Sequence, residues 1–184
     1  MSPGALACLV LALVACSAHG CDHVVSPGGT ALSQLSLFLA STTVTSASSP
    51  ISICFQAGTY DQETCSITTI SVNSPSPSFM FRAQNPGDVV VFSCGVGQDR
   101  SGRGPLFRIT SQTLNQVFMV RDLTFAAPTA AATLAFDDAV FDVIVADSST
   151  TVLVEDVAAD GLSAHSLVTV ASAASVMSVQ LTWR

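Results

Sequence analysis

Carboxylates are the side chains of this 184-residue chain most able to do chemistry, and they gather in its second half. Asp137 and Asp138 are adjacent and follow an aromatic residue, Phe136. Paired carboxylates can act as general acid and base, and clustered carboxylates can hold calcium. Asp137 and Asp138 are therefore the first residues to consider for such chemistry. The alternative interpretation is that they are solvated carboxylates on loops or strand edges. The later acidic residues are Asp142, Asp147, Glu155, Asp156 and Asp160.

Cysteine is the second chemically distinctive residue type. Six cysteines are present, and two of them, Cys8 and Cys16, lie in an N-terminal leader described below. An even number remaining in an exported chain predicts two disulfides, for which three connectivities are possible. The four remaining residues are Cys21, Cys54, Cys65 and Cys94.

Spacing leaves the pairing of these four cysteines open, and strand parity favours one pairing. Cys54 lies on the strand face opposite Ile53 and Phe55, where the N-terminal segment or the helix can cover it. We therefore favour Cys21–Cys54 together with Cys65–Cys94. A zinc site is the alternative interpretation. The chain has no C-x-x-C pair, and its histidines are isolated from other metal-ligating residues, so no metal site is predicted.

The composition argues against several classes of function. Only 10% of the residues are charged, all 6 basic residues are arginine, and the net charge is -7. A basic patch able to neutralise several phosphates is therefore absent, and no nucleic-acid partner is expected. The chain has neither a Gly-x-Ser-x-Gly nucleophile motif nor a P-loop, and no cofactor is expected.

Residues 1–20 are similar to a secretory signal peptide. Leu6–Ala15 form an apolar run that is followed by small and polar residues, and cleavage after Gly20 fits the small-x-small preference. No lysine or arginine precedes the run. Two alternatives stay open, an N-terminal core helix and a lipid anchor on Cys16. The prediction is a secreted or cell-surface protein.

A cap segment over residues 21–50 is predicted to follow the leader. After a polar opening stretch, it contains a short helix at about 31–40, for which Thr30 is the predicted N-cap. Ile51–Phe55 then alternate apolar and polar side chains, which predicts a strand with one buried face. Gly58 supplies a turn, because glycine reaches positive φ without a Cβ penalty.

Short apolar runs replace helical spacing from Ile51 onward, and each is predicted to be strand-like. Turn signals such as Asn85-Pro86-Gly87 and Asp160-Gly161 separate several of them. The runs are Ile67–Val72, Phe79–Phe81, Val89–Phe92, Leu106–Ile109, Val117–Phe125, Ala132–Phe136, Phe141–Val145, Thr151–Val157, Leu167–Val170 and Val176–Trp183.

Three of these runs can be superposed as repeats. Phe118–Phe125 matches Val152–Ala159 at an offset of 34, and Val176–Trp183 matches the second at an offset of 24. Each octet would hold a strand, a polar bend such as Arg121-Asp122, and a second short strand. Chance similarity among apolar octets is the alternative. Stacked repeats bury inward side chains in ladders, which predicts a core of Phe79, Phe81, Phe92, Phe107, Phe118 and Phe125.

A short helix, a polar linker and a strand ending in Gly58-Thr59-Tyr60 resemble the opening of right-handed parallel β-helix proteins of the pectin-lyase-like type. The resemblance implies an all-β solenoid over residues 51–184, with the helix as its N-terminal cap. An antiparallel β-sandwich is the alternative fold. Polysaccharide-cleaving members use paired or clustered carboxylates, so the resemblance implies that Asp137 and Asp138 are the candidate catalytic residues. The Asn-Thr-Asp, Gly-His-Gly and Arg-Ile-Lys signatures of the polygalacturonase branch are absent.

Two functions are compatible with this interpretation. We expect a non-enzymatic module that binds polysaccharide or cell-surface glycans; the alternative is a polysaccharide lyase, hydrolase or epimerase. A membrane span is disfavoured, because residues 161–183 are uncharged but rich in hydroxyl groups. The last repeat has no cap of its own. We therefore expect the natural chain to continue past Arg184, or its end to associate with a partner or a second copy.

Overall fold

A computed structural model of the chain describes residues 20–41, 51–61, 63–74, 78–94, 102–111, 117–127, 134–135, 139–145, 151–160, 162–163, 166–172 and 178–181. Within these ranges lie one helix, α2 (Ala31–Ser41), and 16 strands. Residues 1–19 of the predicted leader, which spans residues 1–20, fall outside them, so the signal peptide stays a prediction. The described residues include no helix with both the length and the apolar character needed to cross a bilayer.

The strands form three main parallel sheets, here called A, B and C, and one short pair. Sheet A contains β1 (His23–Val25), β2 (Ile51–Phe55), β5 (Phe79–Ala83), β8 (Val117–Arg121), β12 (Thr151–Glu155) and β16 (Ser178–Leu181). Sheet B contains β3 (Gly58–Tyr60), β6 (Val90–Phe92), β9 (Thr124–Ala126) and β13 (Ala158–Asp160). Sheet C contains β4 (Ile70–Ser74), β7 (Phe107–Ser111), β11 (Ala139–Val145) and β15 (Ser166–Ser172). The short pair is β10 (Leu134–Ala135) with β14 (Leu162–Ser163).

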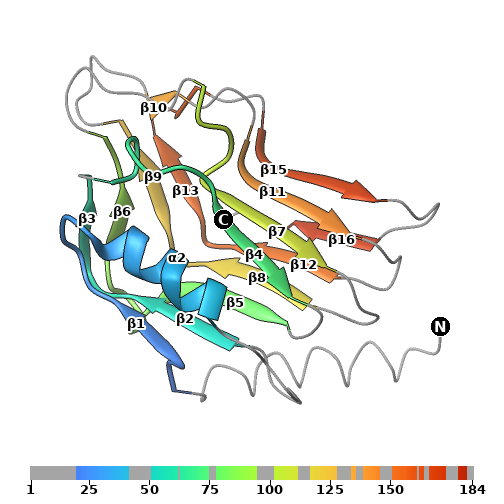
Figure 1. The fold of residues 1–184 in the computed structure, drawn as a ribbon, viewed down its shortest axis with the longest axis horizontal. Coiled ribbons are helices and arrows are strands. Elements are labelled where there is room, and N and C mark those ends of the chain that lie inside the picture. The colour runs from blue at the N-terminus through green and yellow to red at the C-terminus, as the bar shows by residue number, and fades with distance from the viewer. Residues whose placement is uncertain are drawn as a thin grey trace.

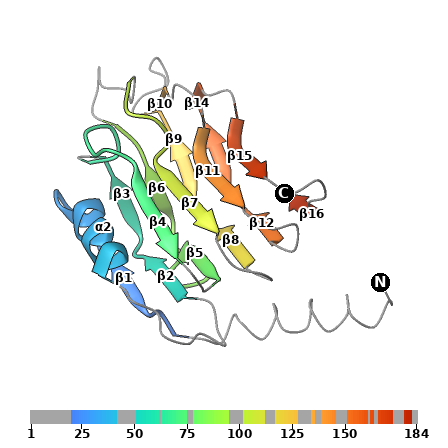
Figure 2. The ribbon, with the colours of Figure 1, turned by 45° about the vertical axis from the view of Figure 1, so that its right-hand side comes forward.

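The chain visits sheets A, B and C in turn and then returns to A, so that each circuit forms one rung. The rungs are β2-β3-β4, β5-β6-β7, β8-β9-β11 and β12-β13-β15, and β16 begins another. Figures 1 and 2 show the strands following one another from β1 toward β15 and β16. Every pairing among the described strands is parallel, which is consistent with a β-solenoid. The antiparallel sandwich is therefore wrong.

The register of sheets A and B confirms one predicted repeat offset, and the register of sheet A corrects the other. Val152 pairs with Phe118 and Ala159 with Phe125, which is the predicted offset of 34. Val152 pairs with Val179 in the next strand, at an offset of 27 instead of 24. The two offsets differ by three residues, and an odd shift of register exchanges the two faces of a strand. The sequence alignment matched residues by type without knowing which strands pair, and it therefore placed this repeat in the wrong register.

Inward phenylalanines form the core between the three sheets. Phe92 stacks on Phe125 and Phe107 stacks on Phe141, each pair with ring centroids 5.1 Å apart. The six phenylalanines predicted to be core are all buried. Fully buried rings come from all three sheets: Phe55, Phe81, Phe92, Phe107, Phe125 and Phe141. Aromatic ladders of this kind join successive rungs by burying large apolar areas.

Strand β2 is buried on both faces, whereas the sequence predicted one buried face. The segment before β1 covers the outer face, where Cys21 is bonded to Cys54. The Ser52 N–H donates to Asp22 Oδ2 at 2.7 Å, and Arg82 Nε donates to Ser52 Oγ at 3.3 Å. The predicted polar opening stretch thus contains a strand, β1, which extends sheet A by pairing with β2.

Helix α2 lies beside β1 at the N-terminal end of the stack (Figure 1) and buries Ala31, Leu32 and Leu35. The predicted helix is confirmed, but its predicted cap is not. The Thr30 side chain accepts only an exposed hydrogen bond from Gln34 Nε2 at 3.1 Å. The carboxylate of Glu63 instead accepts the N–H of Leu32 at 2.6 Å. A residue between β3 and β4 therefore anchors the helix N-terminus.

Glycine at position 58 is required by two features of the structure. Gly58 opens β3 with a φ of 143°, which side-chain-bearing residues rarely adopt. A Cβ atom added there would lie 2.7 Å from Cγ of Pro27. The predicted change of chain direction at this point therefore also brings the segment before α2 into close contact with β3.

Candidate functional site

The predicted catalytic pair, Asp137 and Asp138, lies outside the described residues and remains a prediction. The other late carboxylates that the structure describes are spread over different sheets. Asp142 belongs to β11 in sheet C, Glu155 to β12 in sheet A, and Asp160 to β13 in sheet B. These carboxylates therefore do not form one acidic cluster. Among the residues that the structure covers, no three His, Cys, Asp or Glu side chains lie close enough to hold a metal ion.

Two disulfides are present, with the pairing favoured from the sequence. Cys21 and Cys54 have Cα atoms 5.7 Å apart and join the segment before β1 to β2. Cys65 and Cys94 have Cα atoms 5.5 Å apart and join the turn after β3 to the segment after β6. Each disulfide links neighbouring parts of the N-terminal end of the stack. A cleft also lies at this end of the stack.

A cleft of about 460 Å³ lies beside sheet A, between the segment that leads into β1 and the bends that follow β5 and β8. Its volume is in the range of small-ligand sites. Its lining comes from three segments that are distant in the sequence: Gly20, Cys21 and Val24; Met80, Arg82, Ala83, Gln84, Asn85 and Pro86; and Arg121 and Asp122. Two of the chain's 6 basic residues therefore line a single cleft.

The two cleft arginines occupy equivalent positions in neighbouring rungs. Arg82 pairs in register with Arg121 across β5 and β8. The sequence analysis missed this pair, although a signal was present. Phe79-Met80-Phe81-Arg82 and Phe118-Met119-Val120-Arg121 share the pattern Phe-Met-apolar-Arg. When parallel strands pair in register, the equivalent residues of a repeated pattern lie side by side on neighbouring strands, roughly 4.8 Å apart.

Arg82 is a structural arginine that holds the cleft wall. Its Nη1 donates to the carbonyl oxygens of Ala83 and Gln84, each at 3.2 Å. Its Nε donates to Ser52 Oγ, and its Nη2 lies 3.8 Å from Cys21 Sγ. The guanidinium therefore connects the bend after β5 to the disulfide and to β2.

Arg121 is the cation left available for a ligand. Its Nε forms an ion pair with Asp122 Oδ2 at 2.9 Å, and 31% of its side chain is exposed. Its two Nη groups make no hydrogen bond within the part of the chain that the structure describes. Asp122 is placed beside Arg121 by a bend with a φ of 57°, a conformation in which aspartate is enriched.

Apolar side chains border this polar edge. Met80 lines the cleft and belongs to a small cluster with Met119 and Leu153, separate from the main core. Val24 also lines the cleft and is 39% exposed. None of the described lining residues is aromatic. The cleft thus lacks the stacking platform that aromatic rings provide, and its specific contacts must come from polar groups.

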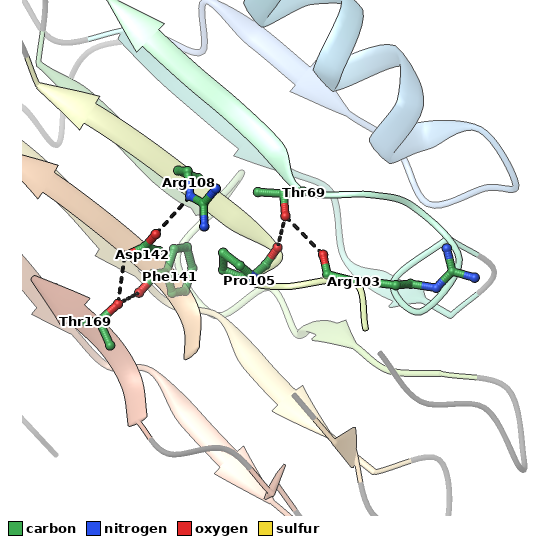
Figure 3. Close-up of polar contacts among 7 residues, drawn as sticks. All are labelled: Thr69, Arg103, Pro105, Arg108, Phe141, Asp142 and Thr169. Carbon is green, nitrogen blue, oxygen red and sulfur yellow. Dashed lines mark hydrogen bonds and ion pairs between the residues drawn. The ribbon is translucent and has the colours of Figure 1, made fainter. Parts of the chain in front are cut away.

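A second polar surface lies on the outer face of sheet C, but its groups bond to one another (Figure 3). Arg108, Asp142 and Thr169 are register partners on β7, β11 and β15. Arg108 Nε pairs with Asp142 Oδ2 at 2.9 Å, and Thr169 Oγ1 donates to Asp142 Oδ1 at 3.0 Å. Thr69 Oγ1 nearby donates to the Pro105 carbonyl at 2.8 Å. This row joins successive rungs.

Two titratable side chains fix β1 against the stack. Burial raises the pKa of Tyr60, whose hydroxyl donates to the Val25 carbonyl at 2.7 Å. Burial also lowers the pKa of His23, whose ring stacks on Phe38 of α2 with centroids 4.0 Å apart. Both residues stabilise β1, and their positions argue for a structural role. These contacts therefore fix β1 and, with it, the part of the cleft lining that Cys21 and Val24 provide.

The described lining of the cleft offers a guanidinium that can bind an anion. One carboxylate, Asp122, is found among the described lining residues, and it is already paired with Arg121. Glycosidases need two carboxylates, one on either side of the scissile bond.

Comparisons with protein-family models, with curated proteins and with solved structures found no match for this chain.

Proposed function

We propose that this protein is a secreted or cell-surface right-handed parallel β-helix of the pectin-lyase-like type that binds an acidic glycan without cleaving it. The three parallel sheets, the short helix beside β1 and the two disulfides support this proposal. The right-handed form is proposed because crossovers between parallel strands of one sheet are almost always right-handed. Disulfides persist mainly in proteins exported to oxidising environments.

The available guanidinium edge of Arg121 in the cleft is the observation that carries this function. A guanidinium donates two parallel hydrogen bonds to a carboxylate or sulfate, and such charge-assisted bonds are the strong ones. The chain has a net charge of -7, so a cleft that collects two arginines has a local charge opposite to that of the whole molecule. The amide side chains of Gln84 and Asn85 add polar groups that suit sugar hydroxyls.

The enzyme alternative depends on Asp137 and Asp138. If these residues acted on a bound glycan, incubation would produce new reducing or unsaturated ends. The double variant Asp137→Asn/Asp138→Asn would then lose turnover while it kept the thermal transition. The binding function predicts instead that no new ends form, and that the double variant binds as the wild type does.

Binding of the purified, oxidised chain to an array of acidic and neutral polysaccharides tests the proposal. We expect binding to acidic glycans, weakened by salt because the contact is ionic. Arg121→Gln should lower the affinity by about tenfold or more, as expected when one charge-assisted contact is lost. Arg108→Gln is the control. Arg108 is an exposed arginine of sheet C that also pairs with an aspartate, so its replacement should leave the affinity unchanged. Equal losses in both variants, or binding to neutral glycans alone, would contradict the proposal.

A further inference from the structure

The two disulfides differ in how a thiol can reach them. Cys65 and Cys94 are 3% and 2% exposed, and Cys54 is fully buried. Cys21 is partly exposed and lines the cleft. Of the four bonded cysteines, Cys21 is thus the residue that an attacking thiolate can approach from the cleft. Accessibility is one of the main determinants of the rate of thiol–disulfide exchange.

The surroundings of the cleft disulfide also favour exchange. Arg82 Nη2 lies 3.8 Å from Cys21 Sγ, and a neighbouring guanidinium stabilises a thiolate. Ser52 Oγ lies 3.7 Å from Cys54 Sγ. A disulfide sulfur has no proton to donate, so the serine hydroxyl is the donor of that contact. Each sulfur of this bond therefore has a donor group that can stabilise it as a leaving thiolate.

From this difference we infer that Cys21–Cys54 is a thiol-exchange site, which a small dithiol reduces in the folded protein while Cys65–Cys94 stays oxidised. A thiolate of the dithiol attacks Cys21 Sγ, forms a mixed disulfide and releases Cys54 as a thiolate, which takes up a proton. The second thiol of the reagent then attacks its own sulfur in the mixed disulfide and releases Cys21. The protein gains two electrons and two protons, and the dithiol becomes a cyclic disulfide.

Reduction removes one of the links that hold the cleft wall. Three contacts remain after the bond is broken: Asp22 N donates to the Ser52 carbonyl at 2.9 Å, Asp22 Oδ2 accepts from Ser52 N, and β1 stays paired with β2. The strand is therefore retained, while Gly20 and Cys21 at its start lose their covalent anchor. The expected result is a local opening of the cleft in an otherwise folded molecule.

The first test uses the oxidised full chain under native conditions. A low concentration of a small dithiol is added, thiols are trapped by alkylation at intervals, and peptide mass spectrometry assigns the modified cysteines. We expect Cys21 and Cys54 to be alkylated about tenfold faster than Cys65 and Cys94, at a rate insensitive to urea below the unfolding transition. Equal rates for both pairs, or earlier reduction of Cys65–Cys94, would overturn the inference.

The second test isolates the contribution of Arg82. In the reduced protein, the rate at which Cys21 is alkylated is measured as a function of pH. Its midpoint should lie below the ordinary cysteine value of about 8.5 and should rise in Arg82→Gln. Arg121→Gln is the matched control, because this arginine lines the same cleft without contacting the sulfur, and it should leave the midpoint unchanged. A midpoint that is the same in the wild type and in Arg82→Gln would remove Arg82 from the site.

Discussion

Replacing Glu63 tests whether a distant side chain, and not the preceding threonine, caps helix α2. The carboxylate accepts the N–H of Leu32 at 2.6 Å and the N–H of Ser33 at 3.2 Å. It also accepts the hydroxyl of Ser33. These two N–H groups belong to the first turn, where a helix offers no partner of its own. Glu63 is 9% exposed, so water replaces it poorly.

The expected cost of the change follows from these contacts. Hydrogen bonds to a charged group contribute about 1.5–3 kcal/mol each, and losses at one site are not additive. Favourable placement of a negative charge at a helix N-terminus adds about 0.3–1 kcal/mol. We therefore expect Glu63→Ala to lower the free energy of unfolding by about 3 kcal/mol. Glu63→Gln should cost about 1 kcal/mol, because the amide oxygen still accepts both N–H groups.

Urea unfolding followed by circular dichroism measures these differences, and Thr30→Ala is the control. The Thr30 side chain takes part in one exposed contact, so its loss should cost no more than about 0.5 kcal/mol. Hydrogen exchange at Leu32 and Ser33 should speed up in Glu63→Ala and stay slow in Thr30→Ala. A larger loss of stability in Thr30→Ala than in Glu63→Ala would refute the assignment of the cap.

Two further predictions concern the same end of the stack. Gly58→Ala should lower the free energy of unfolding by about 2–4 kcal/mol, because it combines an unfavourable φ with a clash against Pro27. Gly87→Ala, at a φ of 85° with open space around it, should cost only about 1–2 kcal/mol in the same urea assay. Burial lowers the pKa of His23 from its ordinary 6.5, so the unfolded chain binds a proton first as the pH falls. Stability should therefore decrease below about pH 6.5, and His23→Phe should show a smaller decrease between about pH 7 and 5.

Strand-forming runs were the most predictable feature of the chain. Runs such as Phe79–Phe81 and Phe141–Val145 coincide with β5 and β11, because apolar residues between turn signals can be buried only as strands here. The short strand β3 was not predicted as an element separate from the strand that begins at Ile51, whereas β9 and β13 match the second short strand predicted within the octets. A single three-residue strand carries too little periodicity to be recognised by itself, and it becomes predictable only where a repeat shows it twice.

The cleft was much less predictable than the strands. Arg121 was recognised only as part of a polar bend, and Arg82 was not singled out. Whether a guanidinium is available depends on its partners, and these lie in other rungs or before β1. Sequence spacing cannot show that Arg82 donates hydrogen bonds to two carbonyl oxygens. It also cannot show that the Nη groups of Arg121 make no hydrogen bond to the described residues. The catalytic interpretation of Asp137 and Asp138 stays a prediction, since they lie outside the described residues.

The sequence by itself determined the all-β character, the position of α2, the phenylalanine core and the favoured disulfide pairing. These features depend on local periodicity, on helix-start signals and on strand parity, all of which are properties of short segments. Only the tertiary structure decided the offset of 27 between β12 and β16, the capping of α2 by Glu63 and the meeting of Arg82 with Arg121. Each of these is a contact between residues far apart in the chain. Such contacts are set by which rung stacks on which, and that choice minimises the free energy of the whole fold, not of any one segment.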